Sequence, residues 1–134
     1  MNAERGVQLT AMADVFEDRL QRGRQAIEKS VKDLEGQFAV KDENCFSGWD
    51  CYDKLLESGV DVVLLCTPPQ FRPMQMEKAV AAGKHIFCEK PVAVDPVGVR
   101  RVMAASQAAA EKKLSLVSGL CWRYDLGVLA TMER

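Results

Sequence analysis

The chain has 134 residues, of which 48% are hydrophobic and 28% are charged, as in an ordinary globular domain. Its 18 Lys and Arg and its 19 Asp and Glu give a net charge of −1, so no basic surface favours nucleic acid or an anionic membrane. The longest apolar run, Val62–Cys66, is far shorter than the roughly 20 residues of a membrane span. Because no apolar segment follows Met1–Arg5, we expect no secretion signal and a cytoplasmic protein.

The cysteines agree with that compartment. They number five, an odd count with no Cys-x-x-Cys pair, so we interpret them as small buried hydrophobic residues kept reduced. His85 is the only histidine, and its spacing to the cysteines matches no zinc motif. We therefore expect no metal site.

Strand-like and helix-like patterns alternate in the first 60 residues. They predict, in order, a strand at 7–13, a helix at 16–34 that ends at Gly36, a strand at 38–40 and a helix at 51–56. Asp14 and Asp50 each precede a predicted helix closely, and an aspartate in that position caps the first turn of a helix well.

The rest of the chain continues the alternation. It predicts, in order, a strand at 60–66, a helix at 72–82, a strand at 85–88, a helix at 96–113, a strand at 114–118 and the opening of a helix at 124–134. The run at 60–66 is β-branched and nearly all apolar, which is typical of a strand covered on both faces. Five alternations of strand and helix favour an α/β fold with a parallel sheet and right-handed crossovers.

Residues that follow the predicted strands are the candidates for function, because ligands of open α/β sheets bind beyond the carboxyl ends of the strands. Four segments qualify: Asp14, Thr67-Pro68-Pro69, Glu89-Lys90-Pro91 and Cys121-Trp122-Arg123. Asp14 suits either the ribose hydroxyls of NAD or the N-cap of a helix, and it would repel the 2′-phosphate of NADP. Thr67-Pro68-Pro69 suits either a rigid wall against a ligand or a plain strand terminator.

Lys90 is the most informative residue, since it directly follows a predicted buried strand. A lysine there can hold a substrate or ribose hydroxyl, can form a Schiff base, or can be an ordinary solvated side chain. A cis peptide bond before Pro91 would fix how Lys90 is aimed. The segment Trp122-Arg123-Tyr124 can line a nicotinamide or sugar pocket, and it equally suits a domain interface.

The segment at 81–91, Ala-Ala-Gly-Lys-His-Ile-Phe-Cys-Glu-Lys-Pro, closely resembles the Glu-Lys-Pro signature of the glucose-fructose oxidoreductase, inositol dehydrogenase and MocA (Gfo/Idh/MocA) family. Thr67-Pro68-Pro69 resembles the loop after that family's fourth strand, and Asp14 matches the acidic end of its second strand. The resemblance spans nearly the whole chain. It implies a Rossmann-like, doubly wound parallel sheet in a two-domain, NAD(P)-dependent oxidoreductase that acts on hydroxyl groups of sugars and polyols.

The resemblance also implies roles for individual residues. Lys90 would be the catalytic residue, hydrogen-bonded to the substrate hydroxyl and to the nicotinamide ribose. Glu89 and the backbone of Thr67 and Pro68 would line the cofactor. Asp14 would hold the adenosine ribose, and Trp122-Arg123 would lie near the nicotinamide. The implied cofactor is NAD rather than NADP, with no metal.

The sequence departs from the family's pattern in several places. No two of its nine glycines are separated by a single residue, so the family's Gly-x-Gly-x-x-Gly turn does not occur in it. Residues 1–6 resemble the tail of the helix that follows that turn. Arg72 stands where many family members have histidine. We interpret residues 1–134 as a partial NAD(P)-binding domain that lacks the first strand, its Gly-rich turn and the C-terminal substrate domain.

Loss of the first strand would have a structural consequence, because that strand is central in the order 3-2-1-4-5-6. Its two neighbours would pair with each other, or the chain would be unstable or form a homo-oligomer. The leading expectation is thus a nucleotide-binding domain that is inactive by itself. Alternatives are a non-enzymatic remnant or interaction module that pairs through exposed strand edges, and an unrelated flavodoxin-like domain with a continuous five-stranded sheet.

Overall fold

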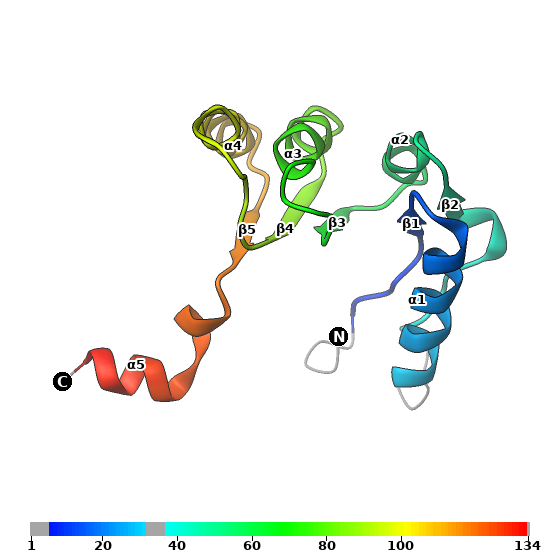
Figure 1. The fold of residues 1–134 in the computed structure, drawn as a ribbon, viewed down its shortest axis with the longest axis horizontal. Helices are drawn as coiled ribbons and strands as arrows, with labels where there is room; N and C mark the ends of the chain where they lie inside the picture. Colours follow the sequence, from blue (N-terminus) through cyan, green and yellow to red (C-terminus); the bar gives the residue numbers. More distant parts are fainter. Residues whose placement is uncertain (1–5, 32–36, 134) are drawn as a thin grey trace. The chain divides into compact units, whose positions relative to one another are not determined.

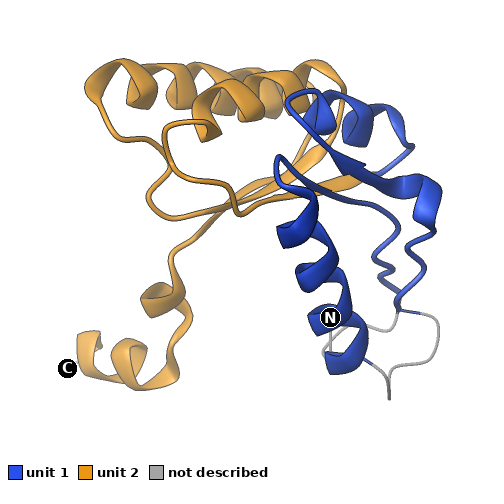
Figure 2. Ribbon diagram, turned by 45° about the vertical axis from the view of Figure 1, so that its right-hand side comes forward, with its two compact units in different colours: residues 1–60 blue, residues 61–134 orange. Residues whose placement is uncertain are grey.

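The computed structural model describes residues 6–31 and 37–133, and the chain divides into two compact units, residues 1–60 and 61–134 (Figure 2). Each unit is an α/β structure with its own parallel sheet. The predicted helix end at Gly36 lies outside the described residues. So does the predicted helix tail at 1–6, apart from Gly6.

Unit 1 contains a two-stranded parallel sheet and two helices. The strand β1 (Met12–Asp14) pairs with β2 (Cys45–Ser47), and both α1 (Glu17–Ser30) and α2 (Cys51–Glu57) contact β1. A short 3₁₀ helix, η1 (Asp42–Asn44), leads directly into β2.

The strand predicted at 38–40 is wrong, because only an isolated bridge between Leu9 and Phe38 forms there. The sequence pattern missed β2, since a three-residue strand behind a charged 3₁₀ turn has no alternation long enough to detect. Pairing with β1 creates this strand, with Met12 opposite Cys45 and Ala13 opposite Phe46.

Unit 2 contains the larger sheet and follows the predicted order of elements (Figure 1). Three parallel strands lie in the order β3-β4-β5 and alternate along the chain with helices. The elements are β3 (Val62–Leu65), α3 (Arg72–Ala81), β4 (His85–Glu89), α4 (Pro96–Glu111), β5 (Leu116–Gly119), the 3₁₀ helix η2 (Cys121–Tyr124) and α5 (Leu126–Met132).

Both α3 and α4 lie on the same face of this sheet (Figure 1). On that face Val63, Ile86 and Cys88 are buried, and Met76 of α3 is completely buried. The other face of the three strands is open within the unit, because Val62 is 54% and Leu64 is 60% exposed. The expectation that β3 is covered on both faces is therefore wrong for unit 2, whose two long helices pack on one side only.

Strand pairing in the described residues stops at the two separate sheets. β1 pairs with β2 in unit 1, and β3 pairs with β4 in unit 2. The closing of the gap by the two flanking strands and the continuous five-stranded sheet of a flavodoxin-like domain both stay predictions. The orders β2-β1 and β3-β4-β5 are those of strands 3-2 and 4-5-6 in a doubly wound sheet.

Whether a cysteine is buried depends on its place in a helix or strand, and not on the apolar stretch around it in the sequence. Cys51 and Cys88 are buried as expected, whereas Cys66 and Cys121 are exposed, contrary to the prediction. Cys66 lies one residue beyond the end of β3. None of the helices in the described ranges is both long and apolar enough to cross a membrane.

Helix starts show which predicted N-caps form. The Asp95 carboxylate accepts a hydrogen bond from the Gly98 amide at 2.6 Å and caps α4. Phe16, not Asp14, is the N-cap of α1. Asp50 occupies the N-cap position of α2, but its carboxylate forms an ion pair with Lys54 at 2.8 Å instead of capping the helix.

This difference predicts unequal effects of two aspartate substitutions. Asp95→Ala should lower the free energy of unfolding of unit 2 by about 1 kcal/mol, because it leaves first-turn amides of α4 without an acceptor. Asp50→Ala should cause a clearly smaller loss, since it removes only an exposed ion pair. Urea denaturation followed by circular dichroism measures both variants. Equal losses would contradict the assignment of Asp95 as the one capping aspartate of the pair.

Candidate active site

The carboxyl ends of β3, β4 and β5 lie at one edge of the unit 2 sheet. Leu65 is opposite Cys88, and Glu89 is opposite Gly119, so the loops that follow the strands start side by side. The loop after β3 contains Thr67 and Pro68, and the loop after β4 begins with Lys90. The structure thus brings four predicted site residues, Thr67, Pro68, Glu89 and Lys90, to the same edge.

The loop after β3 is fixed to the beginning of α3. The Pro68 carbonyl accepts from the Phe71 amide at 3.1 Å, and the Thr67 hydroxyl donates to the Gln75 side-chain oxygen at 2.5 Å. Pro68 and Pro69 contribute no amide donors, and their rings restrict the backbone. The loop is a rigid turn, which agrees with both interpretations of this segment, the ligand wall and the strand terminator.

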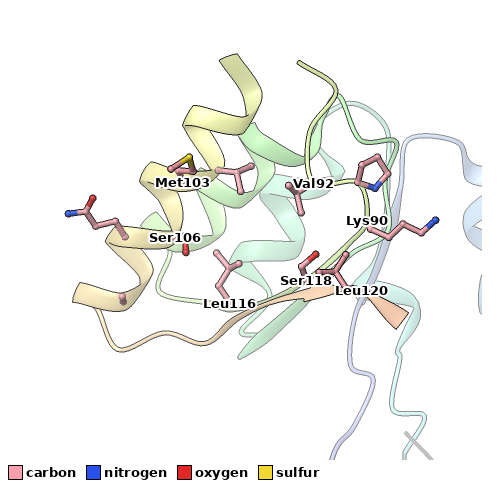
Figure 3. A pocket seen from close by; sticks show the side chains of 11 residues that line it. Lys90, Val92, Met103, Ser106, Leu116, Ser118 and Leu120 are labelled. Atoms are coloured by element: carbon pink, nitrogen blue, oxygen red, sulfur yellow. The ribbon is translucent and has the colours of Figure 1, made fainter. Parts of the chain in front are cut away.

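Lys90 offers a cation without a protein partner at this edge. Its side chain is exposed, and within the described part of the chain its ammonium forms no ion pair or hydrogen bond. The Lys90 backbone amide donates to the Glu89 carboxylate at 3.2 Å, and the peptide bond to Pro91 is cis, as considered from the sequence. In Figure 3 the ammonium points away from the other labelled side chains. An ammonium in this state has three donors for a ligand oxygen.

Arg72, the first residue of α3, lies underneath the two loops. It is only 6% exposed, and its Nε donates to the Thr67 carbonyl at 2.7 Å. Its Nη1 donates to the carbonyls of Glu89 at 2.7 Å and Pro91 at 2.6 Å. The sequence left open whether Arg72 makes any contact. The available signal was a cation at a helix N-terminus, where the helix dipole disfavours positive charge.

An open groove of about 810 Å³ lies beside this edge, between α4 and β5 (Figure 3). Its lining is mostly apolar, with Lys90 as the only charged residue; the others are Pro91, Val92, Val102, Met103, Ser106, Gln107, Ala110, Leu116, Ser118 and Leu120. A surface with one cation and little other polarity suits an apolar group rather than a phosphate. The groove is therefore no candidate for the phosphates of a nucleotide.

The two thiols near this edge are poor nucleophiles. Partial burial raises the pKa of the Cys66 thiol, and the nearby Glu89 carboxylate raises this pKa further, while Arg72 opposes the rise. Burial likewise raises the pKa of Cys88, again opposed by Arg72. Both groups are protonated thiols near neutral pH, which disfavours covalent catalysis by cysteine.

Asp14 belongs to unit 1 and ends β1. Its Oδ1 accepts a hydrogen bond from the Phe16 amide at 2.9 Å, and its other oxygen has no partner among the described residues. The carboxylate is thus held by the local turn and keeps one oxygen for a ligand. Its role as a ribose acceptor stays a prediction.

Trp122 and Arg123 lie in η2, which follows β5 and contacts α5. Trp122 is 72% exposed, and Arg123 is exposed as well. Their role near a nicotinamide stays a prediction. In the ranges that the structure describes, no three His, Cys, Asp or Glu side chains gather as a metal site would require.

The parallel strands, the helical crossovers and the polar residues at the strand ends define a Rossmann-type α/β protein. A structure of scyllo-inositol dehydrogenase from Lactobacillus casei with bound NAD(H) and scyllo-inositol has this fold, with a TM-score of 0.62 and 23% identity over 93% of this chain and 32% of that chain. A structure of a putative myo-inositol dehydrogenase from Sinorhizobium meliloti has a TM-score of 0.64 and 27% identity over 97% of this chain and 33% of that one.

Sequence comparison gives the family. Residues 2–119 match the oxidoreductase family with an NAD-binding Rossmann fold, Gfo/Idh/MocA, and the chain belongs to that family. Inositol 2-dehydrogenase of Paracoccus denitrificans is 36% identical over 81 residues, which are 60% of this chain and 24% of that protein. Inositol 2-dehydrogenase of Salmonella typhimurium is 29% identical over 126 residues, 94% of this chain and 33% of that protein. The chain thus spans about a quarter to a third of the length of these relatives.

Gly119 makes the close packing at the Lys90 edge testable. A Cβ at this position would lie 3.0 Å from both the Glu89 Oε2 and the Phe87 Cζ atoms. Gly119→Ala should therefore lower the free energy of unfolding by about 1–2 kcal/mol through overpacking. It should also shift the NMR signals of Glu89 and Lys90.

Gly23 in α1 provides the matched control, since a Cβ there would meet only Met12 Cε at an ordinary 3.7 Å. Gly23→Ala should be stabilising by about 0.5–1 kcal/mol, because alanine restricts the unfolded chain and favours the helix. Thermal unfolding of both variants shows whether each substitution raises or lowers the free energy of unfolding. A neutral Gly119→Ala would refute the packing described for β4 and β5.

Proposed function

We propose that unit 2 forms the lysine side of a nicotinamide site in an oxidoreductase that acts on a hydroxyl group of a polyol or sugar. The observation that carries this proposal is the unpartnered Lys90 ammonium at the carboxyl edge of a parallel sheet. Membership of an NAD-binding oxidoreductase family supports it, as do the relatives named as inositol dehydrogenases.

In this proposal Lys90 orients and polarises the reacting oxygen. Bound NAD would supply the acceptor for the hydride of the carbinol carbon. The hydroxyl proton would pass to solvent water, and negative charge would build up on the oxygen as it leaves. A fixed ammonium donating to that oxygen stabilises this charge and raises the rate. The Glu89 side chain and the rigid Thr67-Pro68 turn would bound the cofactor next to Lys90.

NAD is the proposed cofactor rather than NADP. The free oxygen of the Asp14 carboxylate suits a ribose hydroxyl, and its negative charge would repel a 2′-phosphate. Structures similar to this chain contain either cofactor, NAD(H) in the scyllo-inositol dehydrogenase and NADP in a 3-ketoreductase from Actinomadura kijaniata. Asp14 is therefore the residue on which this preference depends.

We further propose that a polypeptide of residues 1–134 binds NAD weakly and does not turn over substrate. Its sequence contains no Gly-x-Gly-x-x-Gly turn, and the amides of that turn and of the helix after it are what hold a pyrophosphate. The contacts that Lys90, Glu89 and Thr67 can supply go to the nicotinamide end only. Binding in the millimolar range is the expected result.

The nicotinamide site is tested by NMR titration of the chain with NADH. Shifts should concentrate at Thr67, Glu89 and Lys90 and approach saturation only at millimolar NADH. Lys90→Met should weaken binding about threefold, the effect of losing one exposed hydrogen bond from the ammonium to a ribose hydroxyl. Lys84→Met is the matched control, because Lys84 precedes β4 at its opposite end and should leave the affinity unchanged. Micromolar binding would overturn the proposed weakness, and shifts that avoid Lys90 would overturn the site.

A second candidate function is an interaction module that pairs through a strand edge. The observation that favours it is the β3 strand, which pairs with β4 on one side only and exposes Val62 and Leu64 on its open face. Exposed strand edges of this kind are templates for pairing with another chain.

Light scattering after size exclusion separates this candidate from the first. A stable oligomer that is dissociated by Leu64→Lys and does not respond to NADH would favour the interaction module. A monomer whose Lys90 signals respond to NADH would favour the oxidoreductase site. Leu126→Lys is the control, since Leu126 is also highly exposed but lies in α5, away from β3.

A further inference from the structure

We propose that Arg72 is the positioning residue of the Lys90 loop, which it holds through the backbone on both sides of Lys90. The inference rests on the proposed function for its catalytic consequence, but its structural part can be tested without any cofactor. Arg72 would touch neither substrate nor NAD, so it acts only through the loop that carries Lys90.

Arg72 donates hydrogen bonds to the backbone on both sides of Lys90, the residue that it is proposed to orient. Its Nη1 donates at 2.7 Å to the carbonyl of Glu89, directly before Lys90, and at 2.6 Å to the carbonyl of Pro91, directly after it. Because peptide planes are rigid, fixing the carbonyls on both sides restricts the backbone angles between them. The direction in which the Lys90 side chain leaves the sheet is thereby restricted as well.

The same guanidinium joins this loop to its neighbour. Its Nε donates to the Thr67 carbonyl at 2.7 Å, so one planar group spans the turn after β3 and the turn after β4. A planar guanidinium with several donors in a fixed geometry can serve three carbonyls at once. A lysine ammonium is a point donor at the end of a flexible chain and cannot reproduce this span.

Burying the Arg72 guanidinium at this location costs desolvation free energy, which its hydrogen bonds must offset. It is 6% exposed, it has no carboxylate partner among the described ion pairs, and it lies at the positive end of the α3 dipole. A methionine or leucine would fill a buried site on α3 without this desolvation penalty. We infer that the three carbonyl contacts, rather than the filling of space, are what the arginine provides.

The test compares Arg72→Lys and Arg72→Met with Lys112→Met in the full chain. Lys112 is the matched control, because its Nζ donates to the carbonyls of Val80 at 2.9 Å and Ala81 at 3.3 Å, at the opposite end of α3. The readout is the ¹⁵N order parameter of the Lys90 and Val92 amides, with Phe87 in β4 as the internal reference. Arg72→Lys keeps the charge and nearly the volume, so it decides the question if Arg72→Met fails to fold.

Both Arg72 variants should lower the Lys90 and Val92 order parameters from about 0.85 to below about 0.6, while Phe87 stays rigid. Lys112→Met should lower overall stability and leave these order parameters unchanged. If the loop keeps its order in Arg72→Lys, the proposal is wrong. If order falls equally in the loop and in β4, Arg72 is merely structural and the proposal is again wrong.

NADH titration adds the functional readout. Arg72→Lys should weaken NADH binding about as much as Lys90→Met does, and the double variant should be no weaker than Lys90→Met alone, as expected for residues that act through one contact. Additive losses would overturn the positioning role. If the unsubstituted chain shows no NADH response at Lys90, the proposed function fails, whereas the order parameters still decide whether Arg72 fixes the loop.

Discussion

A buried guanidinium holds together the loops at the carboxyl edge of the unit 2 sheet, where Lys90 lies. A parallel sheet brings the carboxyl ends of β3 and β4 side by side, but the chain beyond them leaves the ladder of backbone hydrogen bonds. Arg72 supplies the missing connection, because it donates to carbonyls in both of the loops that follow. The turn at Thr67, the beginning of α3 and the backbone around Lys90 are thus one hydrogen-bonded unit. Loss of this group would leave three part-buried carbonyls without this donor and would free the Lys90 loop from the sheet.

The rigidity of that edge contrasts with the open face of the same sheet. Leu64, Phe87 and Val117 are opposite one another on three adjacent strands, and they lie on the face that α3 and α4 do not cover. In doubly wound folds helices cover both faces of the sheet, so a face of this kind is normally buried by other parts of the chain. The pattern of β3 reflects this, since its residues are apolar on both faces although only one is covered within unit 2. The apolar run correctly indicated a strand of a parallel sheet, but it contains no information about which segment would cover each face.

Long, strongly periodic elements could be predicted from the sequence, and short ones could not. The bounds of α3 and α4 follow from helical periodicity with a proline in the first turn, and the Asp95 carboxylate caps α4. By contrast, β2 exists only because β1 lies next to it, and Asp50 has the position of a cap while its carboxylate binds Lys54 instead. The location of Lys90 at a strand exit was predictable because parallel strands place their carboxyl ends together. The role of Arg72 was not, since its three acceptors come from two loops whose register is fixed only in the folded sheet.

The distribution of charge at this edge also limits what can bind there. Arg72 donates its hydrogen bonds to backbone carbonyls, and the Glu89 carboxylate accepts from the Lys90 amide. In the described loops after β3 and β4, the cation left for a ligand is therefore the Lys90 ammonium. A phosphate is held by several converging donors, usually backbone amides at a helix N-terminus together with basic side chains. A neutral hydroxyl needs one good donor and a surface against which the rest of the ligand can lie. The Lys90 ammonium next to a rigid, proline-rich turn can bind a neutral hydroxyl group, but it does not supply the several converging donors that hold a phosphate. The charges at this edge therefore support the proposed binding of ribose and polyol hydroxyls by Lys90, and they do not favour a phosphate there.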